Sequence, residues 1–196
     1  SYAGRVPAVA VERLGMVRGN GARAVLVCVY GGRAFEDTLI ELEDVAKRAG
    51  FRVVAAVSAI AEHSVARQFA AGRPDAQDVA QLSEFAQRIR QKLLDGAASE
   101  PSIPGNRPYK QAGGHSMVPH ATEDCVSCGA CAALCPVRAI DKEDPGQVDG
   151  EACISCMRCV SVCSQNARKL DPNKLAAVTQ MLSKACVERR ECEIFI

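Results

Sequence analysis

The feature that most constrains this chain is a pair of cysteine runs with identical spacing. Each run reads C-x2-C-x2-C-x3-C, and the second repeats the first at an offset of 28 residues. The first run consists of Cys125, Cys128, Cys131 and Cys135, and the second of Cys153, Cys156, Cys159 and Cys163. Most of the 11 cysteines of the chain therefore belong to two matching sets. The chemistry of thiolates at this spacing is the first thing to explain.

This spacing is typical of 4Fe–4S clusters. Three cysteines separated by two residues surround one corner of a cubane, and the fourth, a helical turn later, points toward the other cluster. The spacing therefore predicts two clusters with crossed ligand sets. Cluster 1 is expected to take Cys125, Cys128, Cys131 and Cys163, and cluster 2 to take Cys153, Cys156, Cys159 and Cys135.

Disulfides and zinc explain the cysteines less well. Disulfide frameworks are typical of exported chains, and the sequence shows no secretory signal. Zinc also binds C-x2-C pairs, but it takes four ligands, commonly as two separated pairs. Cys28, Cys186 and Cys192 lie outside the two runs, and we expect structural or incidental roles for them.

Composition argues against two other classes of protein. The chain has 24 Lys and Arg against 23 Asp and Glu, a net charge of +1, which disfavours a polybasic nucleic-acid binder. No apolar run approaches the roughly 18 residues of a membrane span. Since no export signal is visible either, we expect a cytoplasmic protein.

The first 95 residues alternate between helical and strand patterns. Helices are predicted from Pro7 to Val17, along an apolar stripe over residues 35–49, and after Asp75, which suits a helix N-cap. Strands are predicted over residues 24–30 and 51–58. This order is typical of a parallel sheet in an α/β layer.

The continuous apolar run over residues 24–30 predicts a strand that is buried on both faces and has a neighbour on each side. Only one neighbour is visible, so one edge of this strand is expected to stay unpaired. We therefore expect a longer α/β domain without its N-terminal part, in line with a first residue that is Ser rather than Met. The alternative is a small three-helix layer on a two-stranded ribbon.

The two halves are separated by residues 96–121, which hold four Pro and four Gly and predict an interdomain linker. We therefore divide the chain into residues 1–95, the linker 96–121, a cysteine domain at 122–170, and a C-terminal helix and tail at 171–196. Within the cysteine domain, Ile140 and Val148 flank a Pro-Gly turn and predict a short hairpin.

Residues 123–170 resemble a bacterial two-cluster ferredoxin, including the stretch Cys135-Pro136-Val-Arg-Ala-Ile140. The second repeat departs from the family pattern in two places. Cys163 is followed by Ser164 rather than Pro, and Arg168 stands where an Ile is usual. Because the ligand set is untouched, we expect the departure to affect only the local turn and packing.

Residues 1–95 resemble the C-terminal half of a flavodoxin-like domain, and the whole chain resembles a family in which such a domain is fused to a two-cluster ferredoxin. The matching stretches are Tyr2–Pro7, Val29–Asp37, Ala61–Ser64, Ala71–Asp75 and Arg189–Phe195. The resemblance implies a partial flavodoxin-like α/β domain, the C-terminal half with parallel strands, followed by an α+β two-cluster ferredoxin domain.

The same resemblance bears on FMN. Tyr2 and the loop Tyr30-Gly31-Gly32 match the positions of the two flavin-facing loops of the family. The Gly-rich loop that cradles the FMN phosphate follows the first strand in that fold, and this sequence lacks it. FMN is therefore expected only in a longer, intact protein.

The expected function is electron transfer by two 4Fe–4S clusters, as the ferredoxin part of an iron–sulfur flavoprotein with a redox protein as partner. One alternative is an FMN-dependent oxidoreductase that uses the clusters as internal wiring, and another is a docking subunit of a larger redox complex. The sequence offers no catalytic acid–base set, and this favours an electron carrier over an enzyme. In an electron carrier the cofactor performs the chemistry, and the protein positions it.

Overall fold

The structure, a computed structural model, describes residues 1–96, 99–113 and 117–196. The chain forms two compact units. The first unit consists of residues 1–63, 67–112 and 185–196, and the cysteine unit of residues 64–66 and 113–184. The tail of the chain and the part of the expected linker up to residue 112 are thus grouped with the first unit. Residues 97–98 and 114–116 of that linker lie outside the described residues.

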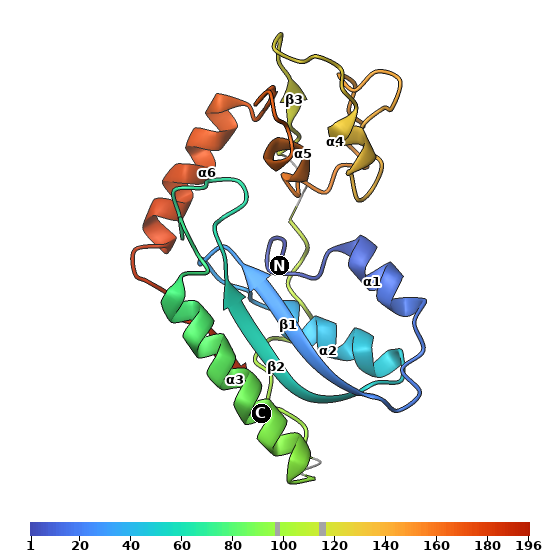
Figure 1. The fold of residues 1–196 in the computed structure, drawn as a ribbon, viewed down its shortest axis with the longest axis vertical. Helices are drawn as coiled ribbons and strands as arrows, with labels where there is room; N and C mark the ends of the chain where they lie inside the picture. The colour runs from blue at the N-terminus through green and yellow to red at the C-terminus, as the bar shows by residue number, and fades with distance from the viewer. Residues whose placement is uncertain (97–98, 114–116) are drawn as a thin grey trace. The chain divides into compact units, whose positions relative to one another are not determined.

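The first unit contains a three-stranded sheet in the order β1-β2-β5. The strands β1 and β2 of this sheet lie side by side in Figure 1. The strands β1 (Arg23–Tyr30) and β2 (Arg52–Ile60) are parallel and pair along their whole length, with one irregularity between Ala24 and Val25. The strand β5 (Glu193–Phe195) is antiparallel to β2 on its other edge. Among the described residues β1 therefore pairs on one side only, which confirms the expected unpaired edge.

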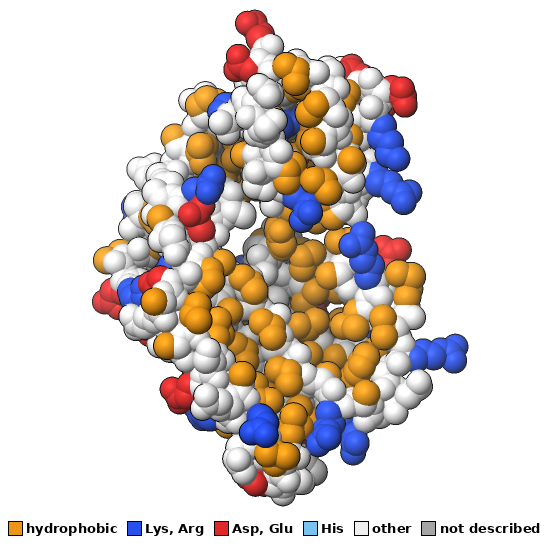
Figure 2. Space-filling view, in the orientation of Figure 1, with side chains coloured by type: hydrophobic (Ala, Val, Ile, Leu, Met, Phe, Trp, Pro, Cys, Tyr) orange, Lys and Arg blue, Asp and Glu red, His pale blue; other side chains and the backbone are white. Residues whose placement is uncertain are grey.

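The expectation that β1 is buried on both faces is wrong. Its burial alternates, and Val25, Val27 and Val29 are 40%, 53% and 50% exposed. The cause is incomplete cover: α2 packs on the opposite face of the sheet, whereas α3 packs against β2 and leaves the β1 half of its own face open. Figure 2 shows hydrophobic side chains gathered over this part of the first unit.

The helices of the first unit are α1 (Ala8–Gly15), α2 (Thr38–Arg48) and α3 (Ala76–Leu94). Two of them are shorter than expected. Pro7 has an extended ψ of 135° and stays outside α1, and Glu36 has a positive φ of 46°, so α2 cannot begin as early as residue 35. The expected cap of α3 is confirmed, because Asp75 and Asp78 exchange side-chain and backbone hydrogen bonds in a capping box.

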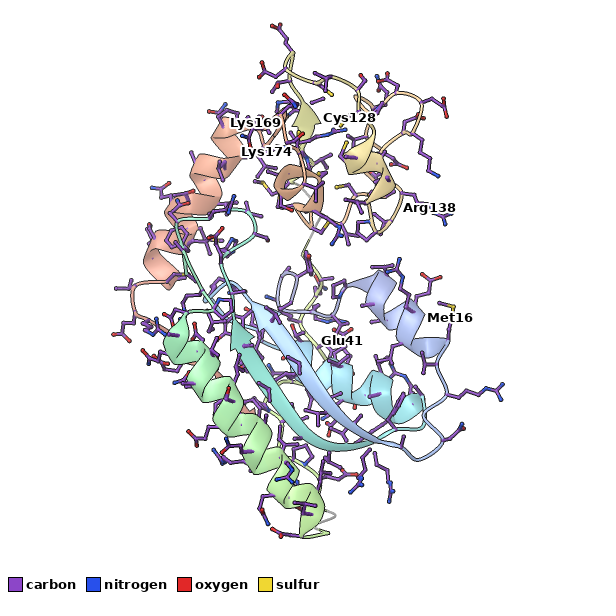
Figure 3. All side chains as sticks on the ribbon, in the orientation of Figure 1. Met16, Glu41, Cys128, Arg138, Lys169 and Lys174 are labelled. Atoms are coloured by element: carbon purple, nitrogen blue, oxygen red, sulfur yellow. The ribbon has the colours of Figure 1, made fainter. Side chains whose placement is uncertain are left out.

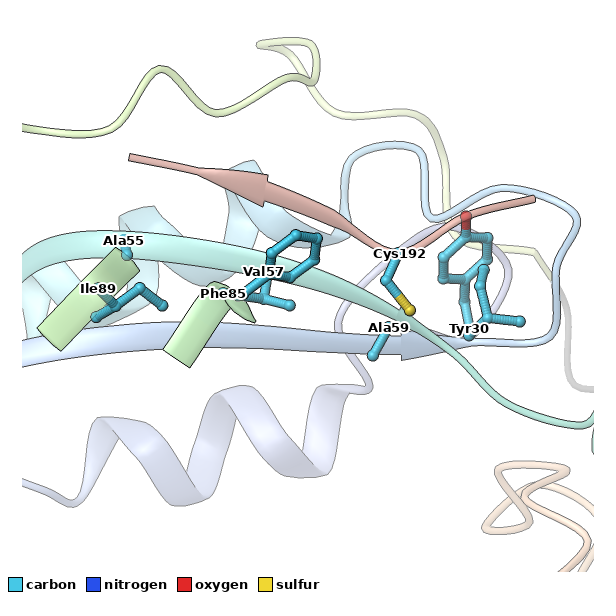
Figure 4. Close-up of a cluster of buried hydrophobic side chains, with 8 residues drawn as sticks. Tyr30, Ala55, Val57, Ala59, Phe85, Ile89 and Cys192 are labelled. Carbon is cyan, nitrogen blue, oxygen red and sulfur yellow. The ribbon is translucent and has the colours of Figure 1, made fainter. Parts of the chain in front are cut away.

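The core of the first unit joins residues that lie far apart in sequence. Phe85 and Ile89 of α3 pack with Val57 of β2, and Cys192 from the tail completes the cluster (Figure 4). The tail is also held by polar contacts, since Arg73 donates to the carbonyl of Arg190 at 2.7 Å. No sequence pattern predicted this third strand.

Residues 99–112 form neither helix nor strand and are anchored on α2 and on Asp37, the residue before it. The backbone N–H groups of Asn106 and Lys110 donate to the buried Asp37 carboxylate at 2.8 and 2.7 Å. Arg107 forms a bidentate pair with Asp44 at 2.9 and 2.6 Å. This segment, called the strap below, is held by charge-assisted hydrogen bonds.

The cysteine unit has little regular structure. Its elements are β3 (His120–Ala121), α4 (Ala130–Ala133), α5 (Arg158–Ser161), β4 (Arg168–Lys169) and α6 (Pro172–Ala185), the last residue of which is grouped with the first unit. The strands β3 and β4 pair antiparallel. A bridge between Ile140 and Val148 confirms the expected hairpin.

Candidate metal centres

The two cysteine runs fold into two copies of the same local structure. The helices α4 and α5 begin 28 residues apart, the offset of the sequence repeat. The residue before each helix is left-handed, with φ of 72° at Gly129 and 60° at Met157. Positive φ also recurs at Ser127 and Ser155. Because left-handed non-glycine residues are uncommon, their recurrence at matching positions indicates that both loops must turn in the same way to converge their thiols.

Each loop forms part of the wall of a cavity. Including the part that is open to solvent, cavity 1 has a volume of about 350 Å³ and cavity 2 of about 360 Å³. The thiols lining cavity 1 belong to Cys125, Cys128, Cys131 and Cys163. The thiols lining cavity 2 belong to Cys135, Cys153, Cys156 and Cys159.

The structure thus gathers around each cavity three cysteines of one run and the fourth of the other. These are the crossed sets that the spacing assigned to cluster 1 and cluster 2, and their role as ligands stays a prediction. The repeat relates the remaining walls as well: Val126 in cavity 1 corresponds to Ile154 in cavity 2, and Ala167 corresponds to Ala139.

Residues 97–180 match the family model of a 4Fe-4S dicluster domain. The match supports iron–sulfur clusters in this part of the chain, and with them electron transfer. A search of curated proteins and a search of solved structures each found no match. In the described part of the chain, no helix has the length and apolar character needed to cross a membrane.

The donor set of the dicluster domain fits iron–sulfur clusters. Within the described residues, no three His, Cys, Asp or Glu side chains are placed to hold one metal ion. A cubane does not need such a group, because its four thiolates bind four different iron atoms rather than one common metal ion.

Backbone N–H groups point at the fourth cysteine of each run. The N–H of Ala139 donates to Cys135 Sγ at 3.3 Å, and that of Ala167 donates to Cys163 Sγ at the same distance. Such donors stabilise a thiolate. Burial raises the pKa of the Cys163 thiol, but the N–H groups outweigh this effect and bring the pKa below its ordinary value. Cys163 is therefore prepared to carry negative charge.

Cys159 shows the opposite effect. Burial raises the pKa of its thiol to about 11 in the absence of metal. Metal ligands must be deprotonated, so Cys159 would have to lose this proton in order to hold a cluster.

Arg168 is the functional candidate that sequence reasoning undervalued. Its side chain is 2% exposed and lines cavity 1, where Nη2 donates to Cys131 Sγ at 3.4 Å and to the carbonyl of Pro145. Its Nε and Nη1 are buried without a hydrogen-bond partner. The expectation for this substitution concerned only the turn and the packing, and the structure adds a contact with a cysteine of the first run. The sequence showed an Arg where an Ile is usual, but only the burial of this side chain in the structure indicates that its charge matters.

The residues expected to face a flavin have structural roles in the first unit. Tyr30, which is labelled in Figure 4, is 7% exposed. Its ring packs edge-on against that of Phe35, with centroids 5.5 Å apart. Burial raises the pKa of the Tyr30 hydroxyl to about 12. A Cβ at Gly31 would lie 2.6 Å from the His63 ring, so close chain packing explains that glycine. Tyr2 forms a backbone bridge with Arg5, and Gly32 has a φ of +84°, which glycine adopts without strain.

Proposed function

We propose that this protein carries electrons through two 4Fe–4S clusters bound by the crossed cysteine sets of the dicluster domain. One observation carries the proposal: two separate cavities are each lined by four cysteines, three from one run and one from the other. When bound, such clusters accept and release single electrons. The protein supplies their position, their shielding and their electrostatic surroundings.

The contacts between the two cavities support exchange of electrons between the clusters. Cys131 lines cavity 1 and Cys159 lines cavity 2, and both belong to one hydrophobic cluster with Ile140. The two cavities are therefore separated by packed side chains of a single small unit. An electron delivered to one site has a short, water-poor path to the other.

The proposal is tested first by metal content. The full chain, loaded anaerobically with iron and sulfide, should hold about eight iron and eight sulfide atoms. Zinc at one or two atoms per chain, in protein prepared without oxygen, would contradict it.

Cysteine variants then test the crossed ligation. Cys135→Ala should destroy cluster 2, so that Cys153, Cys156 and Cys159 become open to alkylation while the first three cysteines of the other run stay protected. Cys163→Ala should give the reverse pattern. Cys186→Ala, at a half-buried cysteine outside both runs, is the matched control and should leave both sets protected. Loss of the cluster nearest in sequence to each replaced residue would refute the crossed assignment.

We also propose that the electron partner is a protein with a basic docking surface. The cysteine unit, residues 113–184, carries 7 Lys and Arg against 8 Asp and Glu, a net charge of −1. Each oxidised cluster with four thiolates adds about −2, so the loaded unit is distinctly negative. Such charge favours encounter with a positive surface and makes the association rate fall with added salt.

For the first unit we propose a likeness to the C-terminal half of a flavodoxin-like domain in a cytoplasmic iron–sulfur flavoprotein. The parallel pair β1 and β2, joined through α2, supports it. FMN binding then depends on a segment that supplies the phosphate loop. A titration of the 196-residue chain with FMN should show weak binding or none, and tight stoichiometric binding would contradict this reading.

A further inference from the structure

The two cavities match in volume and in their lining by four cysteines but differ in charge. Among the residues lining them, Arg168 in cavity 1 is the one charged side chain. The position that corresponds to it in the repeat, 28 residues earlier, is Ile140, which lines cavity 2. One site therefore has a cationic wall where the other has an apolar wall.

The guanidinium of Arg168 is not neutralised by what surrounds it in the protein. Two of its three nitrogens have no partner, and the third contacts a thiol and a carbonyl. An arginine carries a permanent charge, and burying a charge without a counter-charge is strongly unfavourable. The neighbouring Cys131 thiol faces cavity 1, so negative charge in that cavity is what this side chain is placed to meet.

We propose that Arg168 makes cluster 1 the cluster of higher reduction potential, so that electrons entering the dicluster domain come to rest at cavity 1. This inference rests on the proposed function. Reduction moves one electron from an external one-electron donor onto a cluster; the donor is oxidised, no bond is broken, and Arg168 neither gains nor loses a proton. The added negative charge is stabilised by the guanidinium beside Cys131 in a water-poor site. Ile140 offers cluster 2 no such charge.

The test is an anaerobic redox titration of the loaded full chain, followed by electron paramagnetic resonance. In the wild type the two clusters should differ at least tenfold in their reduction equilibrium, which is about 59 mV for a one-electron couple. Arg168→Gln removes the charge but keeps a polar, though shorter, side chain. This variant should make the equilibrium constant for reduction of cluster 1 at least tenfold less favourable, which brings the two potentials together. Arg168→Lys, which keeps a positive charge, should restore most of the difference between them.

Lys169 provides a matched control, because it is the next residue of β4 and its side chain is exposed (Figure 3). Lys169→Gln removes the same charge from a site where water and salt screen it, so neither potential should move appreciably. If Lys169→Gln shifts cluster 1 as much as Arg168→Gln does, net charge rather than the buried guanidinium sets the potential, and the inference is overturned.

A second measurement does not depend on Arg168 variants loading properly. Cys163→Ala removes cluster 1, and the potential that remains should be the lower of the two wild-type values. Survival of the higher potential, or wild-type clusters with equal potentials, overturns the inference while leaving the proposed function intact. A chain that binds no clusters at all refutes the proposed function itself.

Discussion

The two units of this protein are held together by different means. The first unit has two hydrophobic clusters on the two sides of its sheet, built from β1, β2, α2 and α3. Among the described residues of the cysteine unit, the one hydrophobic cluster contains three buried residues, Cys131, Ala132 and Ile140. The first of these is a cysteine of the first run, and the second is its neighbour in sequence. Where the first unit has a packed core, the cysteine unit has two cavities lined by thiols. Stability in one unit comes from apolar burial, and in the other it has to come from what the thiols bind.

Removal of iron should show the difference in stability between the two units most clearly. Treatment of the loaded chain with a chelator under reducing conditions should unfold residues 120–170, because metal binding there replaces core packing. In amide hydrogen exchange these residues should lose protection, whereas β1 and α3 should keep theirs. Full protection of residues 120–170 in the iron-free chain would show that the comparison is wrong.

A core truncation should have the opposite pattern. Phe85 is buried between α3 and β2, and Phe85→Ala should cost the first unit about 3–5 kcal/mol while leaving the iron content unchanged. Val79 lies on the same helix and is 55% exposed, so Val79→Ala should change stability by no more than about 0.5 kcal/mol. Exchange of the β2 amides reports both effects. Loss of most of the iron from Phe85→Ala would show that the two units are coupled more strongly than chain connectivity alone explains.

The strap should respond to acid, with a smaller effect. The N–H of Lys110, followed by those of Asn106, holds the pKa of the Asp37 carboxyl below its ordinary value of about 3.9. A carboxyl with a depressed folded-state pKa stabilises the fold above the unfolded value, and this contribution is lost as pH falls through the folded value. Protection of the backbone N–H of Lys110 should therefore fall only below about pH 4.

Asp37→Asn removes that charge and should make the exchange of residues 99–112 faster at neutral pH and no longer dependent on this titration. Asp95 is exposed at the end of α3, and Asp95→Asn serves as a control that should leave the strap unaffected. Strap protection that is lost already near pH 6 in the wild type would rule out Asp37 as its anchor.

Local patterns predicted the parts of the structure that depend on local chemistry. The cap at Asp75 follows from spacing within a few residues, and the parallel pair follows from the order of helix and strand patterns. The crossed gathering of the thiols follows from the spacing of the two matching runs. The strand β5 did not, because three residues carry no periodicity and their partner Ser58 lies 135 residues away from Glu193. The open face of β1 was missed since an apolar run does not reveal which helix covers it. Arg168 was noticed, but its charge gained meaning only once its burial was known.

The tail has a consequence for how the protein assembles. Since β5 returns to the sheet after the chain has passed through the cysteine unit, residues 113–184 form an insertion within the first unit. When the insertion is folded, its two ends are held at a fixed separation, and when it is unfolded they are joined by a flexible loop. Closing a flexible loop costs entropy that grows with its length. Loss of the clusters should therefore weaken the pairing of β5 with β2 through chain connectivity alone.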